Sequence, residues 1–161
     1  MIFLTVGSHE PFDRLVAAVD RWCGRAPGAQ VFAQITERAE YQPKHLEWVA
    51  QLDQAAYRRK CLEATCLISH AGMGSIITAL ELGKPIVVMP RRGHLQETRN
   101  DHQWSTVREF RGKPGIFVAD DETVLDAEIQ KALLPRREDA RPFLHFAQDR
   151  LISFLSAALK S

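Results

Sequence analysis

Short apolar runs rich in β-branched residues alternate with segments of helical periodicity, and this alternation limits the folds that the chain can adopt. The run Cys66–Ser69 is nearly all apolar, as expected of a strand buried on both faces. Strands joined through helices pair in parallel, because a parallel connection needs a crossover. Strands are predicted over residues 2–6, 31–35, 47–49, 66–69, 86–89 and 116–118.

Five segments between and after these strands predict helices. In the first, Leu15, Val16 and Val19 share one face, and in the second, Tyr57 and Leu62 are predicted to point inward. The whole pattern predicts an α/β, Rossmann-like fold, a parallel sheet with helices on both faces. The first predicted helix runs from Pro11 or Phe12 to Gly24, the second from an Asp53 cap to Ala64, and the third from Gly72 to Leu82, before a Gly83 cap. The fourth runs from about Asn100 to Phe110, and the fifth from an Asp120 or Asp121 cap to Leu134.

The composition is that of a folded protein with little net charge. Apolar residues make up 45% and charged residues 25%, and 21 basic side chains nearly balance 20 acidic ones. No overall field therefore recruits nucleic acid. The three cysteines fit neither disulfide pairs nor zinc spacing and predict buried, reduced thiols in a cytosolic protein. No apolar run approaches the ~20 residues that span a bilayer, and the start of the chain predicts a strand rather than a signal peptide.

The 161 residues contain no repeat and predict one domain, residues 1–161. Its last part predicts a helix over about 138–160 with one apolar stripe. Packing against the rest of the domain explains this stripe, and docking onto a partner protein is the alternative.

A glycine-containing turn follows the fourth predicted strand, in the segment Ser69–Ser75 with the sequence Ser-His-Ala-Gly-Met-Gly-Ser. Its glycines permit a sharp turn and the close approach of a phosphate, and the N–H groups of the following helix favour negative charge. The Ser75 hydroxyl could donate to a phosphate oxygen or cap the helix, and His70 could point at the same group. An ordinary strand-to-helix turn is the alternative, because Ile77 replaces the third glycine of a dinucleotide fingerprint and no Walker lysine follows.

A second polar segment follows the fifth strand, which this topology places beside the fourth. Arg91 or Arg92 could screen phosphate charge, with solvated loop charge as the alternative. The amide of Gln103 suits adjacent sugar hydroxyls, whereas helix capping is the alternative for residues 101–103. Taken together, the two segments predict a site for the diphosphate and sugar of a nucleotide-sugar.

These motifs resemble a known family. His70–Ser75, Gly83–Pro85, Pro90-Arg91 and Asp101–Gln103 are similar to the C-terminal domain of family 28 glycosyltransferases, the donor half of the GT-B fold. The start of the chain resembles the small catalytic subunit of two-component N-acetylglucosaminyltransferases of dolichol-linked oligosaccharide assembly, and more closely the bacterial exopolysaccharide subunits of that type. This resemblance covers residues 1 to about 118 and rests at the start on Phe3–Ser8 and Pro11–Asp13.

The resemblance implies an inverting, metal-independent transfer of a hexose-type sugar from a UDP-sugar to a lipid-linked acceptor, without a cofactor. His9 is the candidate general base, with a residue of the partner, or a positioning role for His9, as alternatives. Thr78 stands where the family has a ribose-binding glutamate, and Glu81 follows one turn later. The resemblance assigns Gly72, Gly74 and Ser75 to the diphosphate, with His70 beside it, and His102 and Gln103 to the sugar. Met73 is predicted with the diphosphate group and Arg91 with the sugar group.

The resemblance also implies a partner, a membrane-anchored subunit that binds the polyprenyl-linked acceptor and recruits this chain from the cytoplasm to the cytosolic face of the membrane. Three alternatives stay open: a sugar-nucleotide epimerase of related fold, a non-catalytic sensor or scaffold, and a soluble homodimer. Neither the sugar nor the acceptor is specified by the residues. If the sugar is acidic, Arg91, Arg92 or Arg99 would be candidates to hold its carboxylate.

Overall fold

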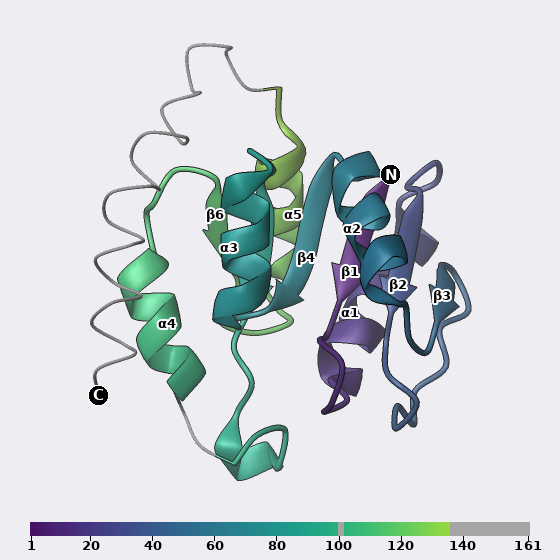
Figure 1. Cartoon of the computed structure of the whole chain (residues 1–161), viewed down its shortest axis with the longest axis horizontal. Coiled ribbons are helices and arrows are strands. Elements are labelled where there is room, and N and C mark those ends of the chain that lie inside the picture. The colour runs from purple at the N-terminus through teal and green to yellow at the C-terminus, as the bar shows by residue number, and fades with distance from the viewer. Residues whose placement is uncertain (100–101, 136–161) are drawn as a thin grey trace.

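A computed structural model describes residues 1–99 and 102–135 and confirms the α/β prediction (Figure 1). Within these residues all strand pairs are parallel, in the order β3-β2-β1-β4-β5-β6. This is the order of a doubly wound sheet, and its direction of winding reverses between β1 and β4. Each predicted strand lies within one residue of its observed bounds. The strands are β1 (Ile2–Thr5), β2 (Val31–Gln34), β3 (Glu47–Val49), β4 (Cys66–His70), β5 (Ile86–Met89) and β6 (Ile116–Val118).

Helices cover both faces of the sheet, and Figure 1 shows α2, α3 and α4 in front of it and α1 and α5 behind it. Successive strand residues point to opposite faces, so Leu4 and Ile68 pack with α1 and α5, whereas Phe3 and Leu67 pack with α2, α3 and α4. The helix predicted over 138–160 lies outside the described residues. The helical elements are α1 (Asp13–Arg25), α2 (Gln54–Glu63), α3 (Met73–Glu81), the short 3-10 helix η1 (Gly93–Leu95), α4 (His102–Phe110) and α5 (Leu125–Leu133).

Two helix details differ from the prediction. Leu62 does not point inward, because its side chain is 50% exposed and Cys61 is buried instead. Tyr57 and Cys61 are four residues apart and share the buried face of α2, which turns Leu62 about 100° away. The last helix begins at Leu125, because the Asp121 carboxylate accepts hydrogen bonds from the main-chain N–H (2.8 Å) and the hydroxyl of Thr123 and so forms a turn before the helix.

A buried carboxylate anchors the loop between β2 and β3 to α1. Asp20 is only 1% exposed and accepts hydrogen bonds from the Tyr41 hydroxyl (2.8 Å) and from the main-chain N–H groups of Lys44 (3.0 Å) and His45 (2.7 Å). The His45 ring packs against Gly24, where an added Cβ would lie 3.1 Å from its Cδ2. The loop is therefore fixed by interactions that its own polar sequence does not reveal.

Thr36 follows β2 in a strained conformation. Its φ is +75°, which a β-branched residue rarely adopts, and its hydroxyl is buried without a hydrogen-bond partner among the described residues. We expect Thr36→Gly to raise the free energy of unfolding by about 1 kcal/mol, because relief of strain and of the unpaired hydroxyl outweighs the added chain entropy. Urea denaturation measures this change. Thr65→Gly, at a position without positive φ, should destabilise the protein, and equal losses at both sites would contradict the prediction.

Candidate functional site

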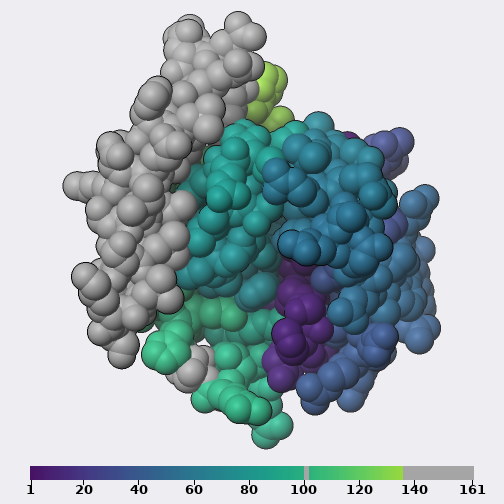
Figure 2. Space-filling model, in the orientation of Figure 1, coloured from purple at the N-terminus to yellow at the C-terminus, as the bar shows by residue number. Residues whose placement is uncertain are grey.

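The candidate site lies at the C-terminal edge of the sheet, where β1 and β4 are adjacent. Thr5 at the end of β1 pairs with Ser69 of β4, and the two following loops leave toward opposite faces. In open parallel sheets, ligands bind in the crevice at such a switch point. The prediction that β4 and β5 end side by side is confirmed by their pairing at His70 and Met89. The structure adds the β1–α1 loop, residues 6–12, to this edge, and this loop (purple) reaches the surface in Figure 2.

His70 fills the space between the two loops. An added Cβ on Gly72 would lie 2.2 Å from its Nε2, and one on Gly7 would lie 3.2 Å from its Cε1. Burial, reinforced by the positive charge of Arg91, lowers the pKa of His70 to about 4. The imidazole is therefore neutral near pH 7 and contributes no positive charge to an anion site. Its Nδ1 lies 3.3 Å from the Ser69 hydroxyl.

The N-terminus of α3 is open. Gly72 is its N-cap residue and provides no side-chain cap, so the N–H groups of the first turn lack a side-chain acceptor there. Gly74 is exposed, and an added Cβ would meet no atom within 4 Å. Gly72 thus allows the His70 ring to pack closely, whereas Gly74 borders open space. This combination suits the approach of an anion to the main chain of residues 73–75.

Ser75 is turned into the protein. Its Oγ is buried and lies 2.9 Å from Ser69 Oγ, which also bonds the Thr5 carbonyl at 2.8 Å. A carbonyl only accepts, so the one hydrogen of Ser69 goes to Thr5 when both bonds form, and Ser75 then donates to Ser69. In this arrangement the main-chain N–H of Ser75, and not the hydroxyl that the sequence suggested, is placed to meet a phosphate.

The close packing of His70 makes a prediction about Gly72. Gly72→Ala should lower the free energy of unfolding by about 1–3 kcal/mol, because the new methyl group overlaps the half-buried His70 ring, which also packs against Gly7. His70→Ser in the Gly72→Ala background should recover part of this loss, as measured by chemical denaturation of the two single variants and the double variant. Strictly additive losses would show that the two residues do not press on each other.

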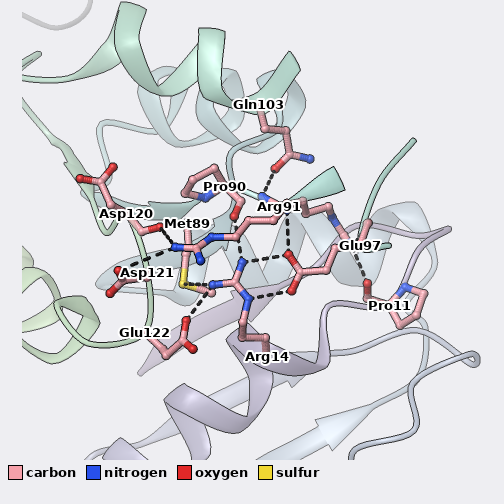
Figure 3. Close-up of polar contacts among 11 residues, drawn as sticks. Pro11, Arg14, Met89, Pro90, Arg91, Glu97, Gln103, Asp120, Asp121 and Glu122 are labelled. Atoms are coloured by element: carbon pink, nitrogen blue, oxygen red, sulfur yellow. Dashed lines mark hydrogen bonds and ion pairs between the residues drawn. The ribbon is translucent and has the colours of Figure 1, made fainter. Parts of the chain in front are cut away.

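Arg91, predicted at the donor sugar, lies inside the protein. It is 4% exposed, and its two terminal nitrogens donate to the carbonyls of Val6, Glu10, Pro11 and Glu97. Figure 3 shows Arg91 between Pro11 and Glu97. All four of its terminal N–H groups are occupied in this way, which leaves none of them for a ligand. Burial lowers the pKa of Arg91 to about 10, so it still carries its charge near pH 7. We assign Arg91 to holding the β1–α1 loop rather than to sugar contact.

A second arginine network, which the sequence analysis did not single out, lies beside Arg91 (Figure 3). Arg14 forms a bidentate ion pair with Glu97 (2.7 and 2.8 Å) and a second pair with Glu122 (2.8 Å). Burial alone would lower the pKa of Arg14, but these carboxylates outweigh it and raise the pKa. Both Arg14 and Arg91 stack on the Phe12 ring, at 5.3 and 4.7 Å from its centroid. Conventional motif reading misses such pairs because their members are up to 108 residues apart.

The other predicted residues lie at different depths. His9 is exposed on the β1–α1 loop, with its Nδ1 2.9 Å from the Ser8 hydroxyl, and His102 is exposed at the start of α4. The Thr78 hydroxyl donates to the Gly74 carbonyl at 2.9 Å, within the first two turns of α3. Glu81 is the last residue of α3 and lies about 12 Å along the axis from Met73, away from the site. The placement therefore favours Thr78 over Glu81 near a ligand.

Residues 1–99 and 102–135 contain neither a metal-binding cluster nor a helix that could cross a membrane. No cluster of three or more His, Cys, Asp or Glu side chains in this part of the chain has an arrangement that could hold a metal ion. No helix within the same residues has both the length and the apolar character required to cross a membrane.

An open parallel sheet with this strand order and a glycine turn at its switch point defines a Rossmann-like domain. This chain belongs to the family described as the glycosyltransferase family 28 C-terminal domain, whose sequence pattern matches residues 1–144. Comparison with curated proteins gave no match.

Solved structures of glycosyltransferases share the fold. The chain is similar to the glycotransferase of kitacinnamycin (TM-score 0.63, 20% identity, 91% of this chain and 38% of that one). It is also similar to Os79 from O. sativa in complex with UDP (0.63, 18%, 88% and 34%) and to MurG from Acinetobacter baumannii (0.59, 15%, 80% and 40%). The fold is that of the C-terminal half of a GT-B glycosyltransferase. The chain spans roughly a third to two-fifths of the length of these proteins.

Proposed function

We propose that this domain binds a UDP-sugar and forms the donor half of an inverting glycosyltransferase that moves a hexose-type sugar to a lipid-linked acceptor in polysaccharide biosynthesis. The observation that carries the proposal is the uncapped N-terminus of α3 at the switch point, with open space at Gly74. Membership of the family supports sugar transfer as the reaction class.

In the proposed reaction an acceptor hydroxyl attacks the anomeric carbon of the sugar, and UDP leaves with the bonding electrons. Negative charge on the diphosphate grows during this step. The main-chain N–H groups of Met73, Gly74 and Ser75 stabilise it, because fixed donors need no rearrangement when the charge appears. His70 lies beside them and is neutral, so it helps to position the diphosphate but does not attract its charge. No cofactor or metal is part of this proposal.

The other substrate groups are assigned by position. Gln103 and His102, at the start of α4, are the candidates for the sugar, and Thr78 is the candidate for the ribose after it exchanges its bond to the Gly74 carbonyl. His9, exposed on the β1–α1 loop, is the candidate general base, with a residue of the acceptor-binding protein as the alternative.

The acceptor-binding half of the enzyme is proposed to be a separate, membrane-anchored protein that holds the polyprenyl-linked acceptor and recruits this domain from the cytoplasm to the cytosolic face. The support is that about three-fifths to two-thirds of the length of each of these similar structures lies outside the part that this chain matches, and a donor domain can close against such a further region. A homodimer in isolation is compatible with this proposal.

Isothermal calorimetry with UDP and a panel of UDP-sugars tests the donor site, with ADP and GDP as controls. The panel contains UDP-N-acetylglucosamine, UDP-glucose, UDP-galactose and UDP-glucuronic acid. Micromolar binding of UDP and of one UDP-sugar supports the proposal, and no binding of any nucleotide overturns it. Transfer assays with the acceptor-binding protein restored then separate the classes: binding without transfer points to a sensor or scaffold, and interconversion of two UDP-sugars points to an epimerase.

A further inference from the structure

Arg91 is a buried cation that contacts main-chain oxygens instead of a carboxylate. Its guanidinium donates to the carbonyls of Val6 (2.8 Å), Glu10 (2.7 Å) and Pro11, which are three points on the β1–α1 loop. A fourth bond goes to the carbonyl of Glu97 at 3.1 Å. Burial of a charge costs free energy, which such bonds only offset. The arrangement is therefore better explained by the geometry that it imposes on the loop than by stability.

The same residue also orients Gln103. The main-chain N–H of Arg91 donates to Gln103 Oε1 at 3.0 Å (Figure 3). Because an N–H needs an acceptor, this bond fixes which end of the amide faces Arg91 and directs the NH2 group of Gln103 elsewhere. An amide held in this way presents its N–H donors and one remaining lone pair to a ligand in a single orientation.

The main chain on both sides of Arg91 is held by Arg14 and Glu97. The Glu97 carboxylate accepts from the main-chain N–H of Arg92 at 2.8 Å and from Arg14 in α1. Arg14 also donates to the carbonyl of Pro90 at 3.2 Å. Pro90 and Arg92, on both sides of Arg91, are thus tied to α1. The main chain at Arg91 is therefore fixed, and so are the relative positions of its side chain and its main-chain N–H.

We propose that Arg91 is a positioning residue that sets the spacing between the β1–α1 loop and the Gln103 amide across the candidate crevice. This inference rests on the proposed function, in which Gln103 meets the donor sugar. The diphosphate is bound by the N-terminus of α3, which Arg91 does not contact in its hydrogen bonds. The positive charge of Arg91 acts on His70 beside that N-terminus and so affects UDP and a UDP-sugar alike, whereas the orientation of Gln103 affects the sugar alone. Loss of the Arg91 side chain therefore lowers the affinity for a UDP-sugar more than the affinity for UDP.

The test compares Arg91→Met and Arg91→Lys with the control Arg111→Met, whose arginine pairs with Asp120 in a partly exposed site. Calorimetry gives the ratio of the affinities for UDP-sugar and UDP. We expect Arg91→Met to lower this ratio about tenfold and Arg91→Lys to lower it less, because a lysine retains part of the bonding. Arg111→Met should leave the ratio unchanged. A merely structural role would lower the melting temperature and leave the ratio intact.

A double-mutant cycle with Gln103→Ala shows whether Arg91 acts through Gln103. In the Gln103→Ala background, Arg91→Lys should change the ratio less than twofold, and fully additive effects would overturn the inference. Should Arg91→Met not fold, the lysine variant carries both measurements. Failure of the proposed function can be told apart from failure of this inference. If the proposed function is wrong, the wild-type protein binds no nucleotide. If only this inference is wrong, the wild type binds UDP and a UDP-sugar, and the Arg91 variants show the same affinity ratio as the wild type.

Discussion

Gly74→Asp should weaken UDP binding by about 100-fold or more while the domain stays folded. The glycine is exposed and borders open space, so the aspartate side chain has room. A carboxylate in the first turn of α3 stabilises the helix by roughly 0.3–1 kcal/mol, but it occupies the place of the diphosphate and repels it. Loss of one or two charge-assisted hydrogen bonds, at about 1.5–3 kcal/mol each, corresponds to this loss of affinity. Calorimetric titration with UDP measures it.

Two variants control for this result. Gly74→Ala should raise the free energy of unfolding by about 0.5–1 kcal/mol and reduce binding only modestly, because it adds a methyl group and no charge. Gln54→Asp introduces the same carboxylate at the first residue of α2, a helix that supplies no group to the proposed diphosphate site, and should leave UDP affinity unchanged. Equal UDP affinity in wild type and Gly74→Asp would place the nucleotide site elsewhere.

Asp20→Asn should lower the free energy of unfolding by about 2–4 kcal/mol. The carboxylate accepts from one hydroxyl and two main-chain N–H groups, and an amide of the same shape turns its own NH2 toward some of these donors. The loop between β2 and β3 then loses its attachment to α1. Urea denaturation measures the loss, and Asp53→Asn, at the exposed cap of α2, should change stability by only a few tenths of a kcal/mol.

The loss of stability caused by Asp20→Asn should depend on pH in a definite direction. Burial by itself would raise the pKa of Asp20, but the hydrogen bonds from Lys44, His45 and Tyr41 outweigh it and lower the pKa below that of an unfolded aspartate. The stabilisation is therefore complete well above about pH 4 and is lost as the pH falls through the folded-state pKa. The stability gap between wild type and Asp20→Asn should shrink on acidification, and a gap that widens below pH 4 would contradict this assignment.

The strands were predictable because burial on both faces leaves continuous apolar runs such as Cys66–Ser69. It was harder to predict which residues of each helix point toward the core. In α2 the choice between Cys61 and Leu62 as the inward residue depends on the exact start of the helix, and hydrophobicity alone favours the wrong one. Asp121 was expected to cap a helix, yet the same carboxylate chemistry also closes a turn before one, and local sequence does not separate the two.

At the candidate site, the sequence identified the glycine turn because its spacing is local. It could not assign different tasks to Gly72 and Gly74, since these depend on where the His70 ring lies. It also placed Arg91 at the ligand, because a charged residue in a loop is normally solvated, whereas carbonyls from a loop 80 residues earlier surround it here. Long-range pairs such as Arg14 and Glu97 leave no periodic signal.

The burial of Cys23, Cys61 and Cys66 has a practical consequence. Burial raises the pKa of Cys23 to about 11 and also raises that of Cys61, and thiol-modifying reagents attack the thiolate form. The native thiols should therefore react only slowly with maleimides. A cysteine introduced by Leu95→Cys, at an exposed position on the β5–α4 loop, would then be the preferred attachment point for a fluorophore. A dye placed there reports ligand arrival or partner closure without first removing the native thiols.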